Sequence, residues 1–134
     1  MPMTMRERPL SPHLQVYKVE LPMMLSGLHR ITGIALAVGS ILLVAWIESA
    51  VYSADAFAAL SRFLGSFFGQ LMLFGWTFSL IYHAASGVRH LIWDTARLLD
   101  VAQILSSSKI LLAITIVLTL LAWILGGGFP GGAL

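Results

Sequence analysis

The sequence predicts an all-α membrane protein with three transmembrane helices. Of its 134 residues, 58% are hydrophobic and only 10% are charged, and the mean hydropathy is +0.89. A water-soluble domain of this size cannot bury so much apolar surface. Three segments are apolar over a length that crosses a hydrocarbon core of about 30 Å, and a helix is the one single-segment structure that satisfies its own backbone in lipid. The predicted spans are residues 25–50, 63–93 and 109–126, which together form a membrane domain over residues 23–126.

Charge and cysteine content exclude several classes of function. The formal net charge is +2 and the isoelectric point about 9.4, but no basic run is long enough to indicate nucleic-acid binding. The chain has no cysteine, which excludes disulfides, iron–sulfur ligation and thiol catalysis by this chain. Residues 1–20 lack the apolar core of a signal peptide. We therefore expect a bacterial protein of the inner (cytoplasmic) membrane that is inserted through its own first helix.

The first 22 residues are expected to form an arm outside the bilayer, because they are polar and contain four prolines. The first helix is expected to begin near Met23, since the preceding Pro22 favours a helix start. Glu48 marks the far end of this helix, and Trp46 stands beside it, where interfacial aromatic residues are common.

The second span is predicted over residues 63–93 and ends at the interfacial Trp93 and the polar Asp94. The connection before it, residues 51–62, is expected to contain a short surface helix around residues 54–64.

The connection after the second span, residues 95–109, is expected to remain helical for a turn or two. Three serines at positions 106–108 then break the helix and cap the next one. The third helix is predicted to start near Lys109 and to end at the glycines 126–128, which leaves residues 127–134 as a short tail.

The distribution of positive charge predicts the orientation in the membrane. Seven of the eight lysines and arginines lie on the arm, at the start of the first helix or between Arg89 and Lys109, whereas the 51–62 connection carries Arg62 alone. The positive-inside rule therefore places the amino terminus in the cytoplasm and the carboxyl terminus outside.

Three of the four histidines lie at one level of the predicted bundle. His29 opens the first helix, and His83 and His90 close the second. His83 lies within the apolar span, where an ionisable side chain is costly without a partner and indicates function. His90 follows about two turns later on the same face, roughly 10 Å away, and Gly87 leaves a gap between them.

A flat, metal-containing ligand suits this arrangement. One imidazole binds the metal, the bare backbone at Gly87 accommodates a ring, and polar groups at the membrane edge receive acidic tails. The pattern thus predicts a haem b site with His83 as the ligand of the haem iron. The alternative is that each histidine only forms a hydrogen bond to a neighbouring helix.

The second axial position of a low-spin haem has no candidate in the spans of this chain. His29 is expected to lie too near the surface to face His83 across a porphyrin. The second ligand is therefore expected from another polypeptide, so the three helices are predicted to be part of a heteromeric helical bundle.

Ser26 and Arg30 form a second candidate site, because residues four apart share a face of a helix. A hydroxyl donor and a fixed cation stabilise the charge that develops on a quinone carbonyl during reduction, and an apolar wall beside them would hold the isoprenoid tail. The alternative is an arginine that extends to the lipid headgroups beside a capping serine. His29 is turned by about 100° from Arg30 and faces elsewhere. Arg89 is expected to face headgroups or a neighbouring subunit.

These motifs resemble a known family. The segment Ser26-Gly-Leu-His-Arg-Ile-Thr-Gly33, together with His83-x-x-x-Gly-x-Arg-His-Leu-x-x-Asp94, resembles the cytochrome b556 membrane-anchor subunits of succinate dehydrogenase, respiratory complex II. The arm segment Arg8-Pro-Leu-Ser-Pro-His-Leu-Gln-Val-Tyr17 also matches the usual start of that family.

The resemblance implies roles for individual residues. His83 falls on the axial haem b ligand of the family, and the second membrane-anchor subunit supplies the other ligand. His29, Arg30 and His90 fall on residues near the haem propionates, and Ser26 and Arg30 fall on the ubiquinone-binding positions. The implied partners on the cytoplasmic side are an iron–sulfur protein and a flavoprotein.

Four functions compete at this point. The first is an electron-transfer anchor, not catalytic alone, that contributes to ubiquinone reduction. The second is the anchor of a quinol–fumarate reductase, which has the same architecture and the opposite flux. The third is a small transporter that uses His83 and Arg89 as a relay, although the spans contain no carboxylate at mid-depth and no broken-helix pattern. The fourth is a membrane scaffold without a cofactor.

Overall fold

The computed structural model describes residues 18–127, so most of the predicted arm and nearly all of the predicted tail lie outside the described residues. The described part contains four helices and no strand: α1 (Leu21–Tyr52), α2 (Ala54–Gly65), α3 (Phe67–Asp94) and α4 (Val101–Leu125). Three of them, α1, α3 and α4, are long and apolar enough to cross a membrane. The predicted all-α class and the three membrane-spanning helices are confirmed.

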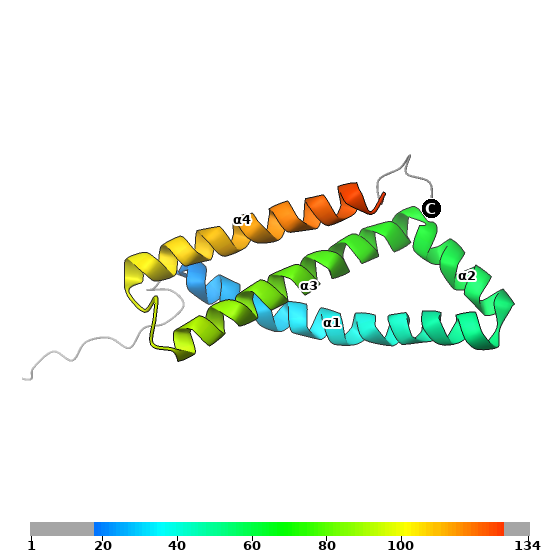
Figure 1. The fold of residues 1–134 in the computed structure, drawn as a ribbon, viewed down its shortest axis with the longest axis horizontal. Coiled ribbons are helices and arrows are strands. Elements are labelled where there is room, and N and C mark those ends of the chain that lie inside the picture. The colour runs from blue at the N-terminus through cyan, green and yellow to red at the C-terminus, as the bar shows by residue number, and fades with distance from the viewer. Residues whose placement is uncertain (1–17, 128–134) are drawn as a thin grey trace, which may run out of the picture.

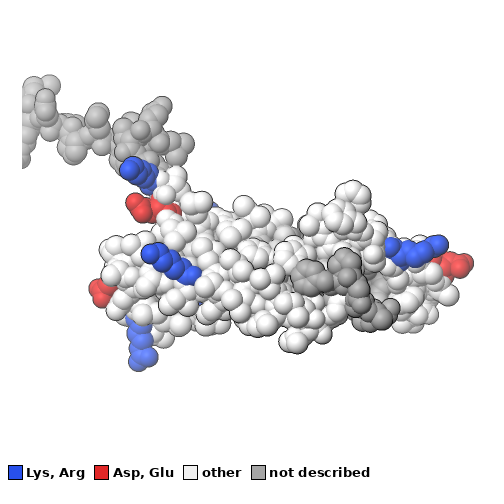
Figure 2. All heavy atoms as spheres, turned by 90° about the horizontal axis from the view of Figure 1, so that it is seen from above, with Lys and Arg blue, Asp and Glu red and all other residues white. Residues whose placement is uncertain are grey.

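Helix α3 packs against both other long helices, and α2 joins α1 to α3 at one end of the molecule (Figure 1). The first turns of α1, the end of α3 and the start of α4 gather at the opposite end. On the face shown in Figure 2, charged side chains occur at the two ends and leave the middle uncharged. This distribution is what a hydrocarbon core requires, because charges at its centre are costly.

The start of the first two long helices differs slightly from the predicted positions. Helix α1 begins at Leu21 rather than near Met23, since Pro22 occupies its first turn instead of preceding it. Helix α3 begins at Phe67 rather than at residue 63. Residues 63–65 belong to α2, whose predicted existence is confirmed, and the hydroxyl of Ser66 caps α3 by accepting the Gly69 N–H at 3.2 Å.

The predicted start of the third long helix was wrong. The chain leaves α3 at Asp94, two residues in the left-handed region (Ala96, φ 58°, and Leu98, φ 59°) form the turn, and α4 begins at Val101. The serines at positions 106–108 do not break a helix but lie inside α4. Each hydroxyl donates to a backbone carbonyl one turn earlier, at 2.7–3.1 Å, so these polar groups are satisfied within the helix.

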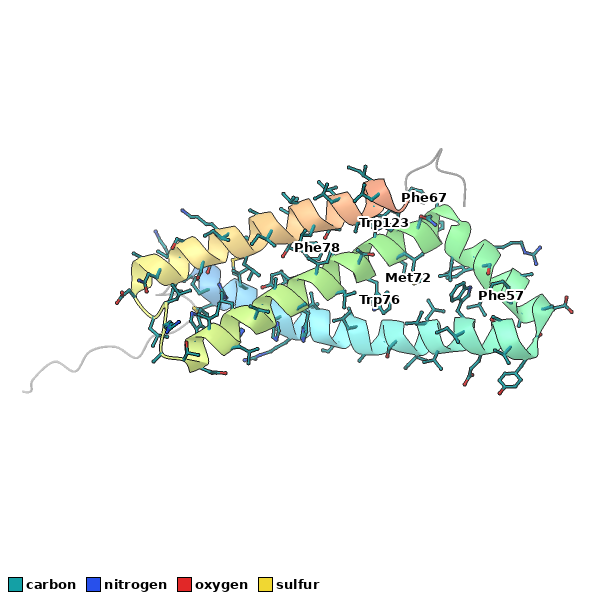
Figure 3. The ribbon with its side chains drawn as sticks, viewed as in Figure 1. Phe57, Phe67, Met72, Trp76, Phe78 and Trp123 are labelled. Atoms are coloured by element: carbon teal, nitrogen blue, oxygen red, sulfur yellow. The ribbon has the colours of Figure 1, made fainter. Side chains whose placement is uncertain are left out.

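Small polar residues form much of the packed interface of α4. Ser108, Thr115 and Thr119 are at most 1% exposed. Their hydroxyls donate to the carbonyl four residues earlier, at 2.7–2.8 Å, which lets the helices approach closely without unpaired groups. Trp123 of α4 donates to Thr77 of α3 at 3.2 Å, and its ring lies between these helices (Figure 3).

Gly39 of α1 lies against the indole of Trp76 of α3, which projects between the two helices (Figure 3). A Cβ at position 39 would overlap the indole ring. We expect Gly39→Ala to lower the stability of the assembled protein by about 1–3 kcal/mol, as overpacking commonly does. Thermal unfolding of the purified complex measures this effect. Gly75→Ala is the matched control, because a Cβ there meets nothing within 4 Å; equal losses in the two variants would contradict the prediction.

Candidate functional site

The three histidine rings converge at one end of the bundle. The rings of His29 on α1 and His83 on α3 are stacked, with centroids 3.9 Å apart and planes inclined by 8°. The ring of His90 lies 5.3 Å from that of His29. All three side chains are only partly buried, so this cluster borders the surface of the isolated chain.

The predicted difference in depth between His29 and His83 was wrong, because stacked rings lie at the same level. Position along one helix does not give depth when neighbouring helices differ in tilt and length. The stacking nevertheless rules out this pair as the two axial ligands of one haem. A separation of 3.9 Å between near-parallel rings leaves no room for iron and a macrocycle between them.

Hydrogen bonding determines the tautomer of His83. Its Nδ1 lies 3.1 Å from the backbone carbonyl of His29, which can only accept a hydrogen bond. Nδ1 therefore carries the hydrogen and Nε2 keeps a free lone pair. The Thr32 hydroxyl lies 3.4 Å from the same Nδ1 and donates to the carbonyls of Leu28 and His29, so it adds a second acceptor. A histidine held at Nδ1 by a backbone carbonyl is in the usual state of a metal ligand.

Two glycines leave space around the His83 ring. A Cβ at Gly33 of α1 would lie 3.1 Å from Cε1 of His83, so the glycine permits the close approach of this ring to α1. A Cβ at Gly87 would meet nothing within 4 Å, so the backbone one turn after His83 is open. This open stretch fits the flat ligand that the sequence predicts.

His90 is held in a similar way within its own helix. Its Nδ1 donates to the Ser86 carbonyl at 2.7 Å, which leaves Nε2 available, and its ring meets Trp93 edge-to-face at 5.1 Å. Among residues 18–127, no group of three or more histidines and acidic residues is arranged to hold a free metal ion. His83 and His90 each have Nδ1 hydrogen-bonded to a backbone carbonyl, so each could offer Nε2 as a single imidazole ligand to an iron held in a macrocycle.

Ser26 and Arg30 are both exposed on α1, and neither has a hydrogen bond through its side chain to another described residue. The apolar groove at this end of the molecule, of about 480 Å³, is centred on another face of α1. At 100° per residue, most of its α1 residues point away from Ser26 and Arg30, and only Gly27 lies within about 60° of Arg30. The groove is lined by Leu21, Met24, Leu25, Gly27, Leu28, Ile31 and Leu112. An apolar wall beside Ser26 and Arg30 is thus not supplied by this groove.

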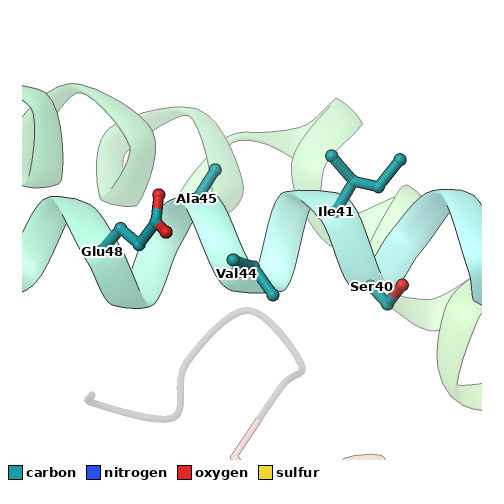
Figure 4. Close-up of a pocket in the computed structure, with 5 residues that line it drawn as sticks. All are labelled: Ser40, Ile41, Val44, Ala45 and Glu48. Atoms are coloured by element: carbon teal, nitrogen blue, oxygen red, sulfur yellow. The ribbon is translucent and has the colours of Figure 1, made fainter.

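A second surface hollow, of about 310 Å³, lies on α1 in the half of the helix away from the histidines. All of its lining residues belong to α1 (Figure 4), and they are Ser40, Ile41, Val44, Ala45 and Glu48. It contains no histidine or cation, so it has no part in the site at the other end.

The sequence led us to expect that Arg89 faces headgroups or a neighbouring subunit, and this prediction was wrong. Arg89 is 6% exposed and lies between α3 and α4, where one guanidinium nitrogen donates to the Ser108 hydroxyl at 2.9 Å. The guanidinium carbon lies 4.5 Å from the centroid of the Trp93 ring. Sequence reasoning missed Ser108 and Trp93 as neighbours of the site. The spacing of Arg89 and Trp93 by four residues was the available signal.

The fold and the site together define a helical protein with three helices able to span a membrane, two of which bring three histidines together at one end of the bundle. Residues 4–122 match the model of the succinate dehydrogenase/fumarate reductase transmembrane subunit family, and the chain belongs to this family. The resemblance seen in the two sequence motifs is thereby confirmed.

Several relatives agree with this assignment. The chain is 42% identical over 117 residues to the succinate dehydrogenase cytochrome b556 subunit of Paracoccus denitrificans, with 87% of this chain and 90% of the relative covered. It is 33% identical over 123 residues to the cytochrome b560 subunit of Reclinomonas americana, with 88% and 85% covered. It is 39% identical over 111 residues to the mitochondrial cytochrome b560 subunit of Sus scrofa, with 81% and 66% covered.

Proposed function

We propose that the chain is a membrane-anchor subunit of succinate:ubiquinone oxidoreductase in a bacterial inner membrane, with its amino terminus in the cytoplasm. Alone it catalyses no reaction. It contributes to a haem b site and to the site of ubiquinone reduction, together with a second membrane-anchor subunit, an iron–sulfur protein and a flavoprotein. The observation that carries the proposal is the His83 imidazole, whose Nδ1 is held by the His29 carbonyl and whose Nε2 is free.

His83 binds the haem iron through Nε2 in this proposal. His29, His90 and Arg30 lie toward the propionates at the cytoplasmic end of the bundle. The His29 ring stacks on one face of the His83 ring and holds it in place, and a residue of the second anchor subunit would supply the other ligand to the iron. When bound, haem b supplies a one-electron redox centre inside the membrane.

Ser26 and Arg30 bind and polarise the ubiquinone head group. Ubiquinone takes up two electrons from the iron–sulfur protein and two protons and becomes ubiquinol. The Arg30 guanidinium is a fixed cation and the Ser26 hydroxyl is a hydrogen-bond donor, and both stabilise the charge that develops on a carbonyl oxygen. Both side chains are exposed on the isolated chain, as expected for a site that partner subunits complete.

The alternative direction of flux belongs to the same family, whose description names fumarate reductase beside succinate dehydrogenase. The three relatives described above are all named as succinate dehydrogenase subunits, which favours quinone reduction. The flavoprotein and the quinone potential set the direction, so kinetics of the whole complex separate the two functions.

The proposal is tested on the chain purified with its neighbouring subunits. We expect a dithionite-reduced minus oxidised spectrum with a b-type α band, and succinate-dependent reduction of ubiquinone faster than quinol-dependent reduction of fumarate. An intact complex without a Soret band would return the histidines to the role of packing residues in a scaffold. Faster fumarate reduction would reverse the proposed direction.

A further inference from the structure

Arg89 carries a buried positive charge that the proposed function does not use. It is 6% exposed on a helix that is long and apolar enough to cross a membrane. An arginine is charged at any physiological pH, and a buried charge without a partner is costly. Among residues 18–127, its side-chain hydrogen bond is to the neutral Ser108 hydroxyl and its cation–π contact is with Trp93, and it forms no ion pair with a carboxylate. The Nε atom has no hydrogen-bond partner in the described part of the chain.

The guanidinium is nevertheless held in place from two sides. Ser108 of α4 accepts a hydrogen bond from it at 2.9 Å, and the same hydroxyl donates to the Ile104 carbonyl at 2.7 Å. The Trp93 ring lies under the guanidinium at 4.5 Å, the distance of a cation–π contact. Arg89 thus joins α4 to α3 as a clamp, defined here as the Arg89–Ser108 hydrogen bond together with the Arg89–Trp93 stack.

The clamp connects directly to the histidine cluster. Trp93 meets the His90 ring edge-to-face at 5.1 Å, and the His90 ring lies 5.3 Å from that of His29. The His29 ring in turn stacks on His83 at 3.9 Å. Four contacts in series, through three intervening side chains, therefore link the buried cation to the residue proposed as the haem ligand. Along α3, Arg89 and His83 are six residues apart, about 9 Å of helix rise.

We propose that Arg89 is a positioning residue and a fixed internal cation of the haem site: its clamp to α4 holds the histidine cluster, and its charge raises the reduction potential of the haem. The inference rests on the proposed function. A fixed cation stabilises whichever oxidation state carries the additional electron, so its removal lowers the potential. For two unit charges on the order of 10 Å apart at an effective dielectric constant of about 20, Coulomb's law gives a change on the order of tenfold in an equilibrium constant, and this sets the size of the effect we expect.

The test is a redox titration of the α band in the purified complex. We expect Arg89→Gln to shift the ratio of oxidised to reduced haem about tenfold at a fixed applied potential, which is a fall of about 59 mV for a one-electron couple. Arg89→Lys keeps the charge and loses the planar fork. The ratio of oxidised to reduced haem at the same applied potential should therefore stay within about threefold of that of the wild type. The electron paramagnetic resonance signal of the oxidised haem should broaden in this variant, because the clamp no longer fixes the histidines.

Two further variants complete the design. Ser108→Ala removes the acceptor on α4 and leaves the charge, so we expect faster loss of haem on warming and little change in potential. Arg97→Gln is the matched control for charge: it removes a cation from the same end of the molecule, but Arg97 is exposed and its field is screened by water and salt. In the Arg97→Gln variant, the ratio of oxidised to reduced haem at the same applied potential should remain within about twofold of that of the wild type.

The outcomes separate this inference from the proposed function. The inference is wrong if Arg89→Gln and Arg97→Gln change the haem potential equally. It is also wrong if Arg89→Gln lowers haem content while the remaining haem keeps its potential, because Arg89 would then be only a packing residue. If Arg89→Gln does not assemble, Ser108→Ala decides, since unchanged haem retention and an unchanged resonance signal would exclude the clamp. A wild-type complex without haem would instead overturn the proposed function, and the inference with it.

Discussion

The assembled complex with His83→Ala should contain less than about a tenth of the haem of the wild type. His83 offers a free Nε2 because its Nδ1 hydrogen is committed to the His29 carbonyl at 3.1 Å. Loss of residues that merely orient a metal ligand already costs about 10–100-fold in affinity, so loss of the ligand itself should cost at least as much. The α3 helix should still insert, since alanine is more favourable in lipid than an imidazole. Haem content per complex and the reduced minus oxidised spectrum measure the result.

His90→Ala is the matched control for this experiment. It removes the same side chain from the same helix, but His90 contacts the cluster through Trp93 and the His29 ring rather than through a hydrogen bond between helices. We expect more than half of the haem to remain. If His90→Ala abolished the spectrum and His83→Ala did not, the iron ligand would be His90 and the assignment made from the Nδ1 hydrogen bond would be wrong.

The sequence predicted those parts of the fold that depend on local composition. Long apolar segments bounded by charges predicted α1, α3 and α4. The lipid bilayer requires each spanning segment to be apolar and helical, independently of the other segments. The start of α4 was missed because the serines at positions 106–108 are compatible with two structures. A serine hydroxyl caps a helix from outside, or it donates to a carbonyl one turn earlier from inside, as the three serines do here.

The sequence predicted that the histidines of the candidate site would converge, but it did not predict their geometry. His29, His83 and His90 were recognisable as histidines in or beside apolar spans, and the structure brings them together. Their relative depth and the burial of Arg89 depend on the tilt and rotation of each helix about its axis. Those angles are set by packing between helices, such as Gly39 against Trp76 and Ser108 against Arg89, and no single segment contains that information.

Ser26 and Arg30 provide the second large expected effect, on quinone rather than on haem. Arg30→Ala removes the one cation on this face of α1, and we expect ubiquinone reduction to fall about 10–100-fold, with a smaller loss of roughly tenfold for Ser26→Ala. Removal of one fixed donor from a site of developing negative charge commonly costs this much or more. Steady-state succinate–ubiquinone kinetics of the assembled complex measure both variants.

Two controls distinguish a quinone site from general damage. Electron transfer from succinate to an artificial dye that accepts electrons before the membrane should be unchanged, since this route does not pass through the quinone site and both side chains are exposed on the described chain. Arg62→Ala removes an exposed arginine at the opposite end of the molecule and should leave quinone kinetics unaffected.

Because Arg30 also lies near the proposed propionate end, haem content decides its role. A loss of haem that parallels the loss of activity would assign Arg30 to the haem, whereas full haem with slow quinone reduction is what a head-group site requires. Unchanged quinone kinetics in both variants would remove Ser26 and Arg30 from the site.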